Sequence, residues 1–175
     1  MTRCVTTLEV IKDYFMYRLN EVGGRTDATL EADENKFVSS EALEMIRKLV
    51  LEAEQKNHEF YELYINESKC KLPQDTYEII KNLQEIAEKL FGDECINWGR
   101  LLSLISFIAY YTYSYACVVP DINTASTFAC KMIEWLTSYI TCKAGMWIEC
   151  NGGWELFVKC REQESSGVTK YWWGK

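Results

Sequence analysis

The feature that most constrains this chain is a segment without charged side chains, from Leu101 to Pro120. It is long enough for a helix that spans a bilayer, which needs about 20 residues. A helix that is apolar on every side must lie either in lipid or among other helices. The rest of the sequence has to decide between these two environments.

Apolar residues recur at three- and four-residue intervals in the segments 5–22, 42–64, 79–90 and 128–140. This spacing predicts amphipathic helices whose apolar faces need a common surface to pack against. The uncharged segment also contains Ser106, Thr112 and several tyrosines, whose hydroxyls fit a protein interior better than hydrocarbon. We therefore predict that it is the buried central helix of an all-α protein.

Glycine residues and N-cap residues predict where the other helices begin and end. The first helix should stop at Gly23, before an acidic loop over 25–38 that is too poor in apolar residues to order alone. Ser39 or Ser40 can cap the second helix, and residues 66–74 look irregular. Asp75 should cap a third helix that ends at Gly92.

Cap residues, a proline and glycines predict the helix ends in the second half of the chain in the same way. Asn97 is a good N-cap for the central helix, and Pro120 closes it. Asn123 or Thr124 should start the next helix. Glycines at 145, 152 and 153 suggest two short helical pieces over 146–150 and 154–161. The sequence contains no alternating strand pattern and no internal repeat.

Composition excludes several classes of function. A chain of 175 residues with 48% hydrophobic residues suits one domain, and a net charge of −7 argues against nucleic acid as a partner. The eight cysteines form no CxxC pair and so lack the spacing of zinc ligands. We expect neither a metal nor a cofactor. We interpret the cysteines as reduced, intracellular thiols that fill space within helices. With His58 as the one histidine, no catalytic arrangement can be argued, and we expect no enzyme activity.

Three segments resemble motifs of one family. NWGR at 97–100 resembles the first homology motif of the Bcl-2 family of apoptosis regulators, WIECNGGWELF at 147–157 resembles its second, and DYFMYRL at 13–19 is similar to its fourth. The motifs follow the family's order. The resemblance assigns structural roles to a set of tryptophans and glycines: Trp98, Trp147, Gly152, Gly153 and Trp154.

The resemblance implies a Bcl-2-like bundle of about eight helices around a central hydrophobic hairpin, with residues 1–162 as the domain and 163–175 as a C-terminal tail. It also implies a hydrophobic surface groove that receives the BH3 helix of a pro-apoptotic relative. Such a ligand carries apolar anchors and one aspartate. Arg100 would bind that aspartate, because a guanidinium offers a two-point fork to a carboxylate.

Further groove residues follow from their positions relative to the motifs. Asn97 can hydrogen-bond the ligand as well as cap its own helix, and Gly99 would let the ligand backbone approach closely. The expected groove lining, for which a place in the core is an equal alternative, consists of Phe60, Tyr61, Tyr64, Ile86, Leu90, Leu102, Ser103 and Phe107.

The chain departs from the family pattern in two places. The second helix, ALEMIRKLVLEAEQKNHEFYELY, lacks the Gly-Asp pair of the third motif, which favours the pro-survival branch that provides the groove. The alternative is a pore-forming, pro-apoptotic effector of the Bax and Bak kind with the same fold. The end, GVTKYWWGK, has no apolar run of spanning length, so either the sequence stops before a membrane anchor or the protein has none.

The resemblance also implies a location. We expect an intracellular protein in the cytoplasm and at the surface of the mitochondrial outer membrane or the endoplasmic reticulum. Association with a membrane through a further tail, and formation of a homodimer through the groove, are left open by the sequence.

Overall fold

The computed structural model describes residues 4–21, 41–69 and 75–165. Within these residues it contains helices and no strands, which confirms the all-α class. The helices are α1 (Thr7–Asn20), α3 (Glu41–Lys69), α4 (Thr76–Leu90), α5 (Trp98–Val118), α6 (Ile122–Cys150) and α7 (Gly153–Ser165). The expected loop over 25–38, the caps at Ser39 or Ser40 and most of the tail over 163–175 lie outside the described residues.

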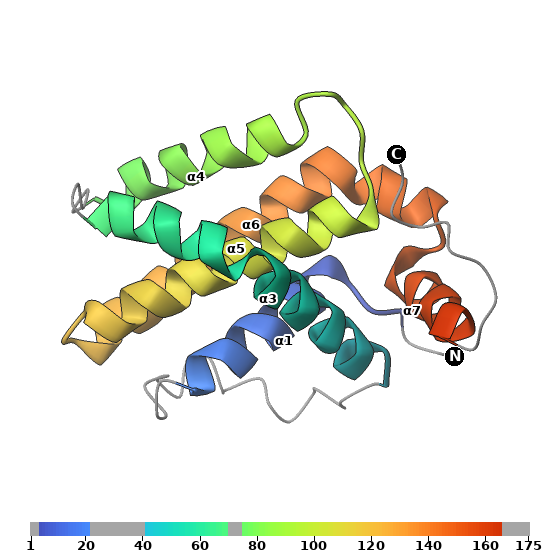
Figure 1. Ribbon diagram of the computed structural model, residues 1–175, viewed down its shortest axis with the longest axis horizontal. Helices are drawn as coiled ribbons and strands as arrows, with labels where there is room; N and C mark the ends of the chain where they lie inside the picture. Colours follow the sequence, from blue (N-terminus) through green and yellow to red (C-terminus); the bar gives the residue numbers. More distant parts are fainter. Residues whose placement is uncertain (1–3, 22–40, 70–74, 166–175) are drawn as a thin grey trace.

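The central position of α5 is confirmed. Leu101, Ile105 and Ile108 have no exposed surface, and in Figure 1 the other helices surround α5. In the described part of the chain α5 is the one helix long and apolar enough to cross a membrane, yet 67% of its most apolar window is buried inside the protein. Its buried hydroxyls are satisfied internally, as Thr112 donates to the Ile108 carbonyl at 2.8 Å.

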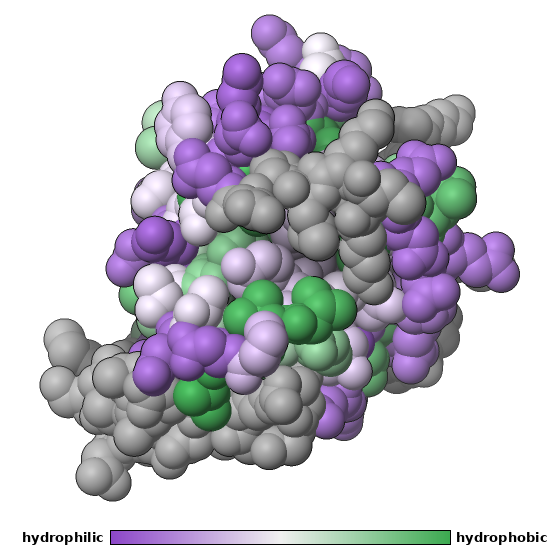
Figure 2. Space-filling view, turned by 90° about the vertical axis from the view of Figure 1, so that its left-hand side faces the viewer, coloured by the Kyte–Doolittle hydropathy of each residue, from purple (hydrophilic) through white to green (hydrophobic). Residues whose placement is uncertain are grey.

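Each neighbour buries its apolar face against this helix or its hairpin partner. α3 packs along α5, α1 contacts α3, α5 and α6, and α4 contacts α5 and α6. The short α7 packs on α3 and α6. Figure 2 shows the side of the molecule that contains the turn from α5 to α6, where a few hydrophobic residues are exposed among mostly hydrophilic ones. Val118 and Ile122, on either side of this turn, are exposed.

The prediction of about eight helices is wrong for the described residues, where there are six. Residues 66–69 belong to α3 and not to an irregular connection. Residues 146–150 are the last turn of α6, which runs through Gly145 without a break. A glycine costs a helix only about 1 kcal/mol, and the buried side chains of Ala144 and Ile148 on either side hold the helix against the core.

The helix caps agree in part with the prediction. Asp75 and Asn97 cap α4 and α5 as expected. The next helix starts earlier than predicted, because Asp121 accepts a hydrogen bond from the Thr124 backbone N–H at 2.8 Å. α1 begins with a reciprocal capping box between Thr6 and Glu9, which the apolar pattern did not indicate.

A buried ionic cluster joins α1, α3 and α5. Arg18 lies 2.9 Å from the Glu54 carboxylate, and Tyr14 donates to the same carboxylate at 2.6 Å. The guanidinium also lies over the Tyr113 ring at 4.5 Å. Burial raises the pKa of Glu54, and the Tyr14 hydrogen bond and the Arg18 charge oppose that rise. Both groups therefore stabilise the ionised form of a buried carboxylate, and Arg18 is the cation that pairs with it.

Replacement of Arg18 by methionine should lower the free energy of unfolding by about 3–5 kcal/mol, because Glu54 is left buried without a cation. The pKa of Glu54 then rises further above that of the unfolded chain, so the folded state binds a proton more readily. Stability falls as pH rises through that folded pKa, and the loss should be larger at about pH 8 than at about pH 5. Urea unfolding at both pH values measures this.

The matched control is Arg47→Met, which breaks the half-exposed pair between Arg47 and Asp13. We expect a loss of about 1 kcal/mol or less, because water screens this pair. Equal losses in the two variants at both pH values would contradict the role given to Arg18.

Candidate functional site

The first turn of α5 places its side chains in different environments. The Asn97 side chain accepts a hydrogen bond from the Arg100 backbone N–H at 2.9 Å, which fixes the start of the helix. Trp98 is buried, whereas Gly99 and Arg100 are half-exposed. One turn therefore anchors the core on one side and presents a cation on the other.

Trp98 is the centre of an aromatic cluster that joins α5, α6 and α7. Its ring lies 5.1 Å from the rings of both Trp147 and Trp154 and stacks on Phe157 at 4.5 Å. Trp154 also donates from Nε1 to the Thr7 hydroxyl at 3.1 Å. These contacts bring the three tryptophans together in one cluster and fix α7 beside the start of α5.

Gly152 and Gly153 form the turn from α6 to α7 with φ of 81° and 73°. Residues with a side chain rarely adopt such angles. A Cβ at Gly152 would also meet Leu156 Cδ2 at 2.3 Å. Glycine at 152 is therefore required both by the backbone and by the close approach of α7.

Arg100 forms an ion pair with an acid of its own chain. Its guanidinium donates to both carboxylate oxygens of Asp93, from Nη2 at 2.7 Å, and Nη1 also donates to the Cys95 carbonyl at 2.6 Å. The hydrogen bonds from Arg100 hold the pKa of Asp93 below its usual range, and Asp93 raises the pKa of Arg100. Both side chains reach solvent, and that of Arg100 is 28% exposed.

Aromatic side chains of α3 and α5 form a continuous surface, which we call the aromatic surface: Phe60, Tyr61, Tyr64, Phe107 and Tyr110. Phe107 lies 5.1 Å from the ring of Tyr61 and 5.4 Å from that of Tyr64. The Tyr61 hydroxyl donates to the Ser103 carbonyl at 3.0 Å and lies 2.8 Å from Ser106 Oγ. Burial raises the pKa of Tyr61 to about 12, so it remains a donor at neutral pH.

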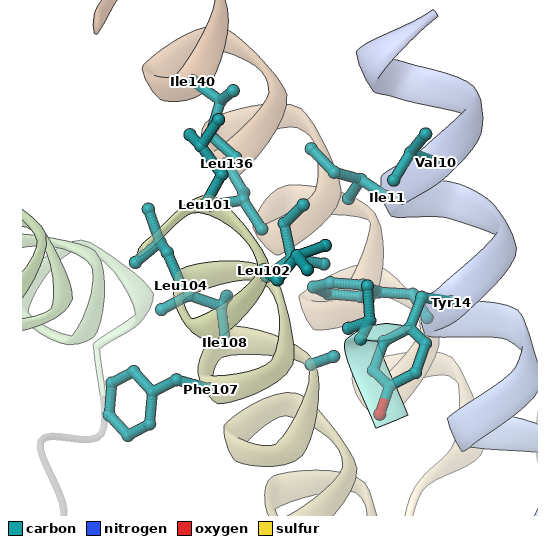
Figure 3. Packing of buried hydrophobic residues seen from close by; sticks show 14 of the residues in the cluster. Val10, Ile11, Tyr14, Leu101, Leu102, Leu104, Phe107, Ile108, Leu136 and Ile140 are labelled. Atoms are coloured by element: carbon teal, nitrogen blue, oxygen red, sulfur yellow. The ribbon is translucent and has the colours of Figure 1, made fainter. Parts of the chain in front are cut away.

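The expected groove residues differ in exposure. Within the aromatic surface, Phe60 is 63% exposed, whereas Tyr61 and Phe107 are buried members that Phe60 and Tyr64 contact. The half-buried members are Tyr64, Ile86, Leu90 and Ser103. Leu102 lies in the core and points toward α1, on the other side of α5 from Phe107 (Figure 3). Leu102 therefore follows the core alternative.

Sequence reasoning missed several residues of this region. Asp93 had no role in the prediction, although a carboxylate in the turn before the helix that carries Arg100 was a usable signal. Leu63 and Tyr77 were placed in helices, but their exposure could not be foreseen from helical periodicity.

The cysteines differ from the prediction. Of the seven in the described residues, all are free and five are exposed, so most of them are not fillers of the core. The described residues also contain no group of three or more histidine, cysteine or acidic side chains that could hold a metal ion.

The chain is similar to known proteins in both sequence and fold. Residues 46–154 match the family model of apoptosis regulator proteins of the Bcl-2 family. Bcl-2-related protein A1 from cattle is 35% identical over 99 residues, which cover 54% of this chain and 53% of that protein. Chicken Bcl-2-like protein 1 is 29% identical over 79 residues, covering 45% and 31%. The match thus spans about half or less of these curated relatives.

A solved structure covers more of the chain. The zebrafish pro-survival protein NRZ, crystallised as a complex with Bad BH3, superposes with a TM-score of 0.64 and 25% sequence identity over 87% of this chain and 90% of that one. The family model covers more than half of the sequence, from α3 to the start of α7, and the fold agrees with it. The chain belongs to the Bcl-2 family of apoptosis regulators.

Proposed function

We propose that this protein promotes survival by sequestering BH3 helices of pro-apoptotic Bcl-2 relatives in a hydrophobic groove formed by α3, α4 and α5. The observation that carries the proposal is the placement of Arg100. It stands half-exposed at the start of the central helix, on which the aromatic surface also lies. A cation beside exposed apolar side chains suits an amphipathic helix with apolar anchors and one aspartate.

The apolar part of the proposed groove comes from residues that are not fully buried. Phe60 and Tyr64 on α3 contact the buried rings of Tyr61 and Phe107 and still keep exposed surface. Ile86 and Leu90 on α4 pack against the core and are also partly exposed. An incoming helix would remove this surface from water, at about 25 cal/mol for each Å². Gly99 would allow close approach of the ligand backbone beside Arg100.

The zebrafish structural neighbour supports both the partner and the branch of the family. That neighbour is a pro-survival protein, and Bad BH3 is its partner in the complex. We extend that partner class to this chain. The proposed activity is binding without catalysis or a cofactor. The net charge of −7 argues against nucleic acid as a partner.

The proposal includes the organisation and location expected from the family. Residues 1–162 would form the Bcl-2-like domain, with 163–175 as the tail. The protein would act in the cytoplasm and at the mitochondrial outer membrane or the endoplasmic reticulum, where pro-apoptotic relatives are neutralised. Homodimers through an empty groove would compete with ligand binding.

Arg100→Ala should weaken binding of a Bad BH3 peptide by on the order of 2 kcal/mol, about thirtyfold, because the peptide aspartate loses its cation in a site covered by ligand. Calorimetric titration of the wild type and the variant measures the change. Lys131→Ala removes an exposed cation on α6 and should leave the affinity unchanged. Equal affinities of wild type and Arg100→Ala would rule out the ion pair.

Phe60→Ala should weaken the same peptide by about 1–2 kcal/mol, because Phe60 offers an exposed apolar contact on α3. Stability should change by less than about 0.5 kcal/mol, since the side chain is 63% exposed. Met146→Ala removes a side chain that is 82% exposed on α6 and serves as the matched control. A loss of affinity in both variants would show that exposed apolar area alone governs binding.

The alternative function, a pore-forming effector, is distinguished by release of dye from liposomes. We expect no release by the purified protein, alone or with a BH3 peptide, because a protein that sequesters the peptide in its groove keeps α5 buried when the peptide is bound. Release that depends on the peptide would instead indicate an effector.

A further inference from the structure

The guanidinium donors of Arg100 are already hydrogen-bonded to a carboxylate of the same chain. Both oxygens of Asp93 accept hydrogen bonds from the guanidinium, and the Cys95 carbonyl accepts another. Two parallel hydrogen bonds are the arrangement by which arginine recognises carboxylates in general. An aspartate from a ligand would need the same donors.

The turn between α4 and α5 holds Asp93 in this position. Phe91 is buried and anchors the turn, and the Glu94 backbone N–H donates to the Phe91 carbonyl at 3.0 Å. Glu94 adopts a φ of 58°, and Asp93 Oδ1 accepts from the Cys95 N–H at 3.1 Å. The carboxylate is thus placed by its own backbone and loses little entropy when it binds Arg100.

The pair is exposed and therefore exchangeable. The side chain of Asp93 is 54% exposed and that of Arg100 is 28% exposed, so solvent reaches both groups. Ion pairs in such positions are weak, because water screens them and solvates each partner when they separate. Asp93 can hold Arg100 at rest and still give way to a second carboxylate.

We propose that Asp93 is a resident competitor for the cation that receives the ligand's aspartate, and that it lowers the affinity for helices carrying that aspartate. The inference rests on the proposed function and adds an intramolecular control of the same site. If Asp93 leaves, breaking the resident pair costs free energy. The apparent affinity is then the intrinsic affinity multiplied by the fraction of molecules in which Arg100 is free. If Asp93 stays, two carboxylates crowd one cation. Both cases weaken binding.

The test compares wild type, Asp93→Asn and Glu94→Gln with two probes. The probes are a Bad BH3 peptide and the same peptide with its motif aspartate changed to asparagine. Asparagine at 93 keeps an oxygen for the Cys95 N–H and removes the charge. Glu94→Gln changes net charge equally at the adjacent exposed position, with no ion pair to Arg100.

Asp93→Asn should bind the aspartate peptide about two- to fivefold more tightly than wild type, the range expected for an exposed pair. The gain should vanish with the asparagine peptide, which does not compete for Arg100. Glu94→Gln should shift both peptides by the same small factor, as a long-range charge effect does. A gain of equal size for both peptides, or no gain for either, would overturn the competition.

A second readout follows the Asp93 carboxyl directly by carbon NMR during pH titration. In the free protein the pKa should lie below the usual range, and binding of the aspartate peptide should return it toward the ordinary value. An unchanged pKa in the complex, together with unchanged affinity in Asp93→Asn, sinks the inference and leaves the proposed function intact. If neither peptide binds any of the proteins, the proposed function fails and the inference fails with it.

Discussion

Burial of α5 is the constraint on which the rest of the structure depends. A helix without charges along its length has no face for water, so each neighbouring helix must cover part of it. α1, α3, α4 and α6 do so with their own apolar stripes. Completely covered residues such as Ile105 set the positions of those helices, and burying an aliphatic side chain of this kind contributes about 1.5–3 kcal/mol. The surface of the site is therefore built on a rigid core.

The start of α5 connects that core to the site. Trp98 fixes the helix end between Trp147 and Trp154, and two residues later Arg100 leaves the same turn toward solvent. The direction of the guanidinium thus follows from tryptophan packing as well as from its own hydrogen bonds. A site built on a packed helix end holds its geometry more closely than one built on a loop.

Much of the fold could be predicted because it depends on local signals. Apolar periodicity located the helices, and the N-caps at Asp75 and Asn97 are short-range features that a sequence displays directly. The errors arose where tertiary contacts override a local signal. Gly145 resembles a break, but buried neighbours carry α6 through it.

The site was less predictable than the fold, because exposure and pairing are properties of the assembled helices. Phe60 and Tyr61 are adjacent aromatic residues with the same helical propensity, yet one faces solvent and the other bonds to Ser103. Leu102 and Ser103 separate in the same way on α5. Periodicity identifies the apolar face of each helix, but it does not say which part of that face a neighbour leaves uncovered.

The pairing of Arg100 with Asp93 bears on the selectivity of the proposed groove. An unpaired guanidinium that reaches solvent would attract any carboxylate, including those of the protein's own acidic surface or of a second copy. A resident acid satisfies the donors without filling the apolar surface, so it discriminates against partners that offer charge alone. A helix that also buries apolar anchors can offset the small cost of displacing Asp93. Even a complex with a micromolar Kd has a binding free energy of about 8 kcal/mol, which is much larger than that cost. The proposed competition at the cation would thus shift selectivity toward partners that satisfy both parts of the site.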